Sequence, residues 1–294
     1  MRTIKKMLSL STRYLGERNI HPARRTAEEI VAFVLKMSRV DLYLHFDRKI
    51  LHEEWYACLS YLKRKGGGEP LEHMIRVVEF FQCQLEITPS VLIPRQETEI
   101  LLWKACQYIK KELPENAIAW DLCTGSGCLG LGLKKAFPKF VVTLSDISPD
   151  CIEIAAKNAK KNRLEVTCLI GDLLEPFTGK KANVIFCNPP YLSKREFDEL
   201  HSGVKDFEPT SALNGGETGL EFFEKLSVLL PQFLYPNGWV FLEIGALQRL
   251  EVERIFSRGK WKKIISDKDW SGKDRFIFLP VSYTHLRAHE TSLH

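Results

Sequence analysis

The clearest chemical signal in the sequence is a short proline-rich loop made of Asn188, Pro189, Pro190 and Tyr191. It follows the apolar run Asn183 to Cys187, which predicts a buried strand and places the loop at the carboxyl end of that strand. The two prolines fix φ and remove two backbone donors, so the loop presents acceptors: the Asn188 side-chain carbonyl and the Pro189 backbone carbonyl. Tyr191 can hold a planar group by stacking. An ordinary turn is the competing interpretation, because Asn and Pro are common turn residues.

Such a loop suits a substrate that offers a planar NH₂ group. The nitrogen of an amide or an exocyclic amine is a poor nucleophile because its lone pair is conjugated, so an enzyme must grip both N–H bonds and aim the nitrogen. A sulfonium methyl group is already a strong electrophile, so positioning and transition-state hydrogen bonding would dominate, without a metal or a covalent intermediate. We therefore predict in-line methyl transfer without a general base of ordinary strength.

A glycine-rich segment, Asp121 to Gly127, follows the apolar run Ala117 to Leu122 and precedes an apolar helical stretch. Its glycines allow a tight turn and the close approach of a ligand to the helix N-terminus. Gly125, Gly127 and Gly130 also satisfy the G-x-G-x-x-G pattern of dinucleotide sites, which is weakly specific on its own. The segment predicts a nucleotide-type ligand loop, and it leaves a nicotinamide-dependent oxidoreductase open.

Two carboxylates end neighbouring strand candidates. Asp146 closes the run VVTLSD, where it can accept both hydrogen bonds from a ribose diol. It could instead cap the next helix, although Ser148 or Asp150 could do that. Asp172 follows the next strand candidate and could contact an adenine amino group, with loop capping as the alternative.

From about residue 90 the chain alternates helical stretches with short apolar runs, which indicates a parallel sheet covered on both faces. The last two strand candidates are separated only by a turn-rich segment and should pair antiparallel. A parallel sheet that ends in an antiparallel hairpin is typical of Rossmann-like methyltransferases and unusual for dehydrogenases. We predict an α/β fold of this kind, with strands at Ala117 to Leu122, Phe140 to Ser145, Val166 to Ile170, Asn183 to Cys187, Trp239 to Ile244, Trp261 to Ser266 and Arg275 to Leu279.

The first 68 residues differ in pattern, and we expect them to form a small helical domain. Apolar residues at positions 27, 30, 31, 34 and 35 fall on one helical face. Gly66, Gly67 and Gly68 follow three basic residues and cannot hold a helix. We expect residues 69–90 to be a linker with a short strand pair, and residues 91–280 to be the methyltransferase domain.

Residues 281–294 fit no element, and we expect an appended or disordered tail there. His285 and His289 lie four residues apart in it, but no third metal ligand is evident. The eight cysteines form no C-x-x-C pair, which favours reduced thiols in a cytoplasmic protein and argues against a metal site. No segment is apolar enough for a signal peptide or a membrane helix. The net charge of +5 comes from interleaved charges and does not by itself imply nucleic acid.

Several segments together resemble the release factor glutamine N5-methyltransferase family, over about residues 10 to 279. Besides the Asn188 to Tyr191 loop, they are Leu92 to Glu99, Glu208 to Gly216 and Leu242 to Gly245. Two positions depart from the family pattern: Cys123 stands where a glycine is usual, and Gln96 where a proline is usual.

The resemblance implies a helical N-terminal domain that docks a peptide chain release factor. It also implies a domain that methylates the glutamine of the factor's Gly-Gly-Gln tip with S-adenosylmethionine. The implied substrate residues are Asn188, Pro189, Pro190, Tyr191, Arg95 and Glu97. The implied cofactor residues are Cys123, Thr124, Gly125, Ser126, Gly127, Asp146, Asp172, Leu173 and Asn188.

Three other functions fit part of the sequence. Adenine-N6 methylation of DNA or RNA would use the same loop, but the basic target-recognition segment is missing, so we expect no direct nucleic-acid binding. An oxidoreductase would leave the Asn188 to Tyr191 loop unexplained. A non-catalytic S-adenosylmethionine-binding adaptor would not need Asn188 and Tyr191.

Overall fold

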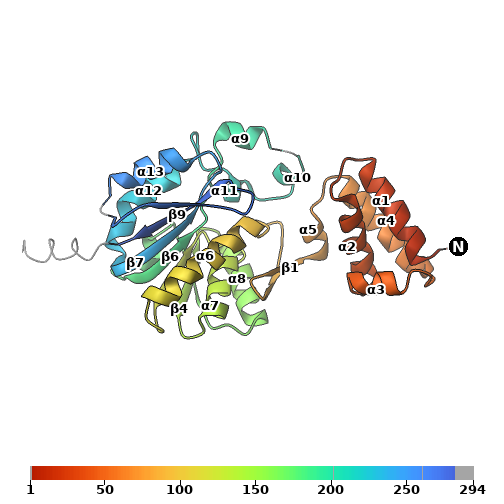
Figure 1. Cartoon of the computed structure of the whole chain (residues 1–294), viewed down its shortest axis with the longest axis horizontal. Coiled ribbons are helices and arrows are strands. Elements are labelled where there is room, and N and C mark those ends of the chain that lie inside the picture. The colour runs from red at the N-terminus through yellow and green to blue at the C-terminus, as the bar shows by residue number, and fades with distance from the viewer. Residues whose placement is uncertain (1, 201, 260, 282–294) are drawn as a thin grey trace, which may run out of the picture. The chain divides into compact units, whose positions relative to one another are not determined.

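The computed structural model describes residues 2–200, 202–259 and 261–281 (Figure 1). They form two compact units: a helical unit within 1–76 and 201–207, and an α/β unit that holds the rest. Of the segment expected to be a tail, only Val281 is described, and it forms an isolated bridge with Trp261. The remainder, including His285 and His289, lies outside the described residues. In the part of the chain that is described, no helix has the length and apolar character to cross a membrane.

The helical unit is built on amphipathic helices whose apolar faces meet in one core. Figure 1 shows these helices near the N-terminus, in red and orange. Ile30 and Val31, on the predicted apolar face, are fully buried. Residues 71–75, within the segment expected to be a linker, form a helix whose Leu71 and Met74 are buried in this core. The helices are α1 (Ile4–Gly16), α2 (Ala23–Leu35), α3 (Arg39–Leu44), α4 (His52–Gly66), α5 (Leu71–Ile75) and α10 (Ser202–Lys205).

A buried carboxylate joins two of these helices. The Glu28 side chain is 2% exposed; it accepts hydrogen bonds from Arg24 at 2.7 Å and Arg39 at 2.7 Å, and another from Tyr43. We expect Glu28→Ala to lower the free energy of unfolding by about 2 kcal/mol, since it breaks a buried charge cluster whose two arginines can still reach water. Glu29→Ala, which removes an exposed pair with Arg25, should cost under about 0.5 kcal/mol in the same urea titration. Equal losses would contradict this assignment.

The α/β unit contains a seven-stranded sheet in the order β5-β4-β3-β6-β7-β9-β8. The first five strands of that order are parallel, while β9 pairs antiparallel with both β7 and β8. This confirms the predicted fold. The sheet strands are β3 (Ile118–Leu122), β4 (Val141–Asp146), β5 (Thr167–Ile170), β6 (Ala182–Cys187), β7 (Leu234–Glu243), β8 (Ile265–Lys268) and β9 (Asp274–Pro280). The short pair β1 (Val77–Phe80) and β2 (Cys83–Glu86) precedes them, also as predicted.

Successive residues of a strand point to opposite faces of the sheet, and here the residues on both faces are apolar. Helices therefore cover both faces. In β6, Val184 and Phe186 join the core on one face, whereas Ile185 and Cys187 join the core on the other. Figure 1 shows α6, α7 and α8 on one face and α12 and α13 on the other. The helices are α6 (Gln96–Glu112), α7 (Cys128–Ala136), α8 (Pro149–Lys161), α9 (Lys194–Asp198), α11 (Thr210–Leu213), α12 (Glu221–Leu229) and α13 (Arg249–Ser257), with short 3₁₀ turns at Glu175–Phe177 and Leu230–Gln232.

One strand prediction was wrong in its bounds. The segment Trp261 to Ser266 was expected to be a strand, but β8 begins at Ile265 and continues through polar Asp267 and Lys268. The Trp261 ring packs edge-on against Phe256 of α13, at 6.1 Å between ring centroids. Trp261 is therefore apolar because its ring packs against α13. The strand β8, in contrast, is defined by backbone pairing with β9, which continues beyond the apolar residues.

Candidate active site

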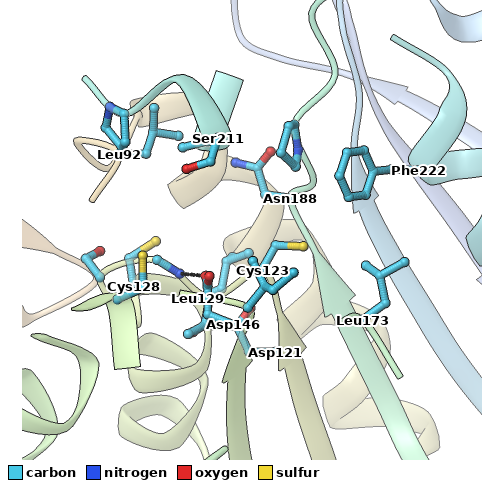
Figure 2. A pocket seen from close by; sticks show the side chains of 18 of the residues that line it. Leu92, Asp121, Cys123, Cys128, Leu129, Asp146, Leu173, Asn188, Ser211 and Phe222 are labelled. Atoms are coloured by element: carbon cyan, nitrogen blue, oxygen red, sulfur yellow. Dashed lines mark hydrogen bonds between the residues drawn. The ribbon is translucent and has the colours of Figure 1, made fainter. Parts of the chain in front are cut away.

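A cavity of about 250 Å³ lies at the carboxyl ends of the parallel strands in the α/β unit. Figure 2 shows Leu92, Ser211 and Asn188 facing Cys123 and Asp146 across this cavity. Predicted residues that line it are Cys123, Thr124, Gly125, Ser126, Asp146, Asp172, Leu173, Asn188 and Pro190. Gly127, Pro189, Tyr191, Arg95 and Glu97 are not among the lining residues.

The loop after β3 turns sharply beside the cavity. Gly125 has φ +54°, and a Cβ at that position would meet nothing within 4 Å, so the loop faces open space. Gly127 has φ +85° and stands at the N-cap of α7, where a Cβ would press on Leu131 at 3.1 Å. Gly127 therefore shapes the turn, whereas Gly125 leaves room for a ligand near the N-terminus of α7.

Asp121 is a buried cavity residue to which sequence reasoning gave no role. Its Oδ2 accepts hydrogen bonds from Thr124 Oγ1 at 2.5 Å and from the Gly130 amide at 2.9 Å. Burial raises the pKa of Asp121 to about 7. Gly130 is required for this contact, because a Cβ there would stand 2.1 Å from Leu144 Cδ2. Asp121 holds the glycine loop against α7. Its sequence signals were its place at the end of a strand and at the start of the glycine-rich segment.

Asp146 lies at the end of β4, and each of its two carboxylate oxygens accepts a hydrogen bond from one backbone amide. Oδ2 accepts from Gly125 N at 2.9 Å, and Oδ1 accepts from Ser148 N at 3.0 Å. Burial raises its pKa above the ordinary value. Ser148, rather than Asp146, caps α8 through the Cys151 amide at 3.3 Å. These bonds hold the Asp146 carboxylate at the cavity wall, where it can accept hydrogen bonds from ligand hydroxyls.

Asp172 follows β5 and lines the same cavity. Within the described residues its carboxylate makes no hydrogen bond, and the 3₁₀ turn after it has no side-chain cap. Loop capping, the alternative interpretation of Asp172, therefore has no support in these contacts. Its backbone amide donates to Glu175 at 3.4 Å, which holds the turn in place.

The loop after β6 is held by buried polar contacts. Asn188 Nδ2 donates to Thr98 Oγ1 at 3.3 Å, and Thr98 Oγ1 donates to Glu243 Oε2 at 2.6 Å. Tyr191 OH reaches Glu243 Oε1 at 3.4 Å, and the Tyr191 carbonyl accepts from Gln248 Nε2 at 2.7 Å. Tyr191 is partly buried beside the sheet core, and burial raises its pKa. Its ring was expected to stack on the substrate, but it lies outside the cavity lining.

Arg95 and Glu97 flank the start of α6. Arg95 Nη2 pairs with Glu208 Oε1 at 2.5 Å, and Glu208 also accepts from the Ile93 amide at 3.3 Å. These bonds tie the segment before α6 to Pro209, Ser211 and the rest of one cavity wall. Arg95 therefore braces that wall from outside the cavity.

Sequence reasoning missed several residues that line or support the cavity. Thr98, Glu208 and Glu243 stand inside segments that carried the family resemblance, which was the available signal, but no role was assigned to them. Phe222 and Lys225 of α12 line the cavity and had no signal, because their place depends on how α12 packs. Burial raises the pKa of the lining Cys151 thiol to about 11, so this side chain is not a nucleophile at neutral pH.

Cys123, which stands where the family that the sequence resembles usually has a glycine, adopts a left-handed conformation with φ +53°. An L-residue there costs about 1–2 kcal/mol, while a glycine costs about 0.5–1 kcal/mol in chain entropy. We expect Cys123→Gly to raise the free energy of unfolding by up to about 1 kcal/mol in urea titration, without loss of affinity for the cofactor that the resemblance implies. Cys123→Ala keeps the strained φ and should give no gain. An equal gain in both variants would trace the effect to the thiol instead.

Comparison with known proteins gives concordant matches for the two units. Residues 6–75 match the PrmC N-terminal domain family, and residues 102–202 match the methyltransferase small domain family. A release factor glutamine methyltransferase of Chlamydia trachomatis serovar L2 is 40% identical over 277 residues, covering 94% of this chain and 93% of that protein. The protein of the same description from Geobacter sulfurreducens is 34% identical, covering 94% of this chain and 95% of its own length.

Among solved structures, a methyltransferase from Pyrococcus furiosus has a similar fold, with a TM-score of 0.51 and 20% identity. The match covers 69% of this chain and 90% of that one.

Proposed function

Because the chain belongs to the release factor glutamine methyltransferase family, we propose that it methylates the side-chain amide nitrogen, N5, of the glutamine in the Gly-Gly-Gln motif of peptide chain release factors. The enzyme is an S-adenosylmethionine-dependent methyltransferase. The observation that carries the substrate assignment is the Asn188 carboxamide in the cavity wall, turned by Thr98 so that its carbonyl is left for a substrate N–H. We place the reaction in the cytoplasm, where it would support translation termination.

The cavity residues fit the cofactor. When bound, S-adenosylmethionine supplies an electrophilic methyl group on a positively charged sulfur. Asp146 would hold the ribose hydroxyls, because its carboxylate lines the cavity at the end of β4 and is fixed there by the Gly125 and Ser148 amides. Asp172 and Leu173 would border the adenine, and residues 123–126 would pass close to the methionine part through the open face at Gly125.

The chain's own groups would then orient the substrate nitrogen. Asn188 Oδ1, in the cavity wall, would accept one N–H bond. The Pro189 carbonyl, next to it in the loop although Pro189 is not among the lining residues, would accept the other, and together they would fix the amide plane and direct the nitrogen lone pair into the cavity. Pro190 lines the cavity beside them, and its ring fixes φ in this part of the loop. Tyr191 supports this loop through its contacts with Glu243 and Gln248. The proton lost by the nitrogen would pass to solvent.

The helical unit is the proposed docking surface for the release factor. Residues 1–76 contain 15 Lys and Arg against 9 Asp and Glu, whereas the remaining residues contain 27 against 28. The positive balance of the chain therefore belongs to this unit, which favours an acidic protein partner. Binding of the release factor to the isolated chain should weaken as salt is raised.

The test is a methyl-transfer assay with labelled S-adenosylmethionine. Purified release factor, its Gln→Ala variant in the Gly-Gly-Gln tip, and unmethylated duplex DNA are offered side by side. We expect label on the intact release factor alone. Label on DNA would reassign the same cavity to adenine, and no label on any substrate with S-adenosylmethionine still bound would favour a non-catalytic adaptor.

A further inference from the structure

A hydrogen-bonded chain of three side chains runs behind the cavity wall, from Asn188 through Thr98 to Glu243. Resting on the proposed function, we propose that Thr98 is a positioning residue: its hydroxyl, held by Glu243, fixes the Asn188 carboxamide with Oδ1 toward the substrate nitrogen. Thr98 lines the cavity near the start of α6, and Glu243 ends β7, so three separate elements are joined.

The orientation follows from counting protons. A threonine hydroxyl has one proton to donate, and the 2.6 Å bond to the Glu243 carboxylate uses it. Thr98 Oγ1 is then only an acceptor toward Asn188, so the Asn188 group that faces it must be the NH₂. Among the residues that the structure describes, none donates to Asn188 Oδ1, which leaves that acceptor for the substrate.

Burial keeps water from replacing the hydrogen bonds among Asn188, Thr98 and Glu243. Thr98 and Glu243 are each 2% exposed. A flipped Asn188 would set its carbonyl against the lone pairs of Thr98 Oγ1 and would turn its NH₂ toward the substrate's own N–H groups. Both contacts would be repulsive, so the orientation of one amide decides whether the planar NH₂ of the substrate is gripped or rejected.

The protonation state of Glu243 should decide the direction of its hydrogen bond with Thr98, and through it the orientation of Asn188. Burial raises the pKa of Glu243 to about 7. The charge of Glu97 on α6 also raises this pKa, whereas Arg275 on β9 and the hydrogen bond from Tyr191 after β6 lower it. The charge of Glu243 in turn raises the pKa of the Cys128 thiol on α7. Above this pKa the carboxylate can only accept, so Thr98 must donate to it. Below it, Glu243 can donate to Thr98 Oγ1, and the Asn188 orientation is no longer fixed. The turnover rate kcat should therefore fall as the pH drops through about 7.

Two substitutions at Thr98 separate the hydroxyl from the space it fills. Thr98→Val is nearly isosteric and lacks the hydroxyl, and it should lower kcat on release factor about 10- to 30-fold with little change in KM for S-adenosylmethionine. Thr98→Ser restores the hydroxyl and should keep kcat within about threefold of the wild type. Glu243→Gln keeps an acceptor that does not titrate, so its kcat should lose the decline below pH 7.

A readout that needs no turnover accompanies these rates. The side-chain ¹⁵NH₂ signals of Asn188, followed in the full-length protein, should shift in Thr98→Val and stay near their wild-type position in Thr98→Ser. An unshifted Thr98→Val signal, equal rates for Thr98→Val and the wild type, or equal losses in Thr98→Val and Thr98→Ser would each overturn the inference. A wild type that leaves the release factor unlabelled would refute the proposed function instead, and the Asn188 signals would still decide the role of Thr98.

Discussion

Asn188→Ala is expected to lower kcat on release factor by about 10³-fold, while S-adenosylmethionine binding changes by less than about fivefold. The reason is that Asn188 Oδ1 contacts the substrate nitrogen, whose hydrogen bonds strengthen as it attacks, and losing one such preorganised group typically costs about 10²–10³ in rate. The cofactor contacts at Asp146 and at the glycine loop are untouched. Single-turnover methyl transfer at saturating cofactor measures the effect directly.

A matched control lies on the same strand. Asn183 stands near the start of β6, where its Oδ1 accepts the Ile118 amide at 2.8 Å, far along the strand from the loop at its carboxyl end. Asn183→Ala should lower the free energy of unfolding by about 1 kcal/mol and leave kcat unchanged. If Asn188→Ala kept more than about a tenth of the wild-type kcat, the gripping role of Asn188 would be wrong.

Much of the fold could be predicted because the strands are buried on both faces and therefore read as short apolar runs. Six of the seven strand predictions overlap the observed strands along most of their length, from β3 to β7 and at β9. The failure at β8 has a physical cause: backbone pairing with β9 does not require apolar side chains, so Asp267 and Lys268 continue the ladder without a hydrophobic signal.

The helical unit shows a second limit. Residues 202–205 form α10, which clusters with residues 1–76 although more than a hundred residues separate them in the chain. A reading along the sequence assigns consecutive residues to one domain, so it has no means of returning this short segment to the helical unit. Leu71 and Met74 of α5 posed a similar difficulty, because the three glycines before them suggested a linker.

At the site, the predicted residues at strand ends and in the glycine loop share one cavity because the parallel strands bring their carboxyl ends together. The residues that support the site from behind the cavity wall could not be predicted. Thr98 and Glu243 come from α6 and β7, and only the packing of α6 on the sheet brings their side chains within 2.6 Å. Sequence spacing carries no information about such a contact. The place of Asp146 could be predicted, in contrast, because it directly follows an apolar run that forms a strand.

Asp146→Ala is expected to raise the Kd of S-adenosylmethionine about 100-fold, while kcat at saturating cofactor falls far less. Each charge-assisted hydrogen bond to a ribose hydroxyl contributes about 1.5–3 kcal/mol, so losing two would cost about 3 kcal/mol or more. Titration calorimetry on the full chain measures the Kd. The free energy of unfolding should also fall by about 1–2 kcal/mol, because the Gly125 and Ser148 amides lose their acceptor.

The control for this variant is Asp150→Ala, which removes an exposed carboxylate from the first turn of α8, four residues further along the chain. Its Kd should match the wild type, since a general loss of negative charge near the cavity is not what binds the ribose. A similar Kd increase in both variants would mean that Asp146 acts through charge at a distance. An unchanged Kd in Asp146→Ala would remove Asp146 from the cofactor site, although it lines the cavity.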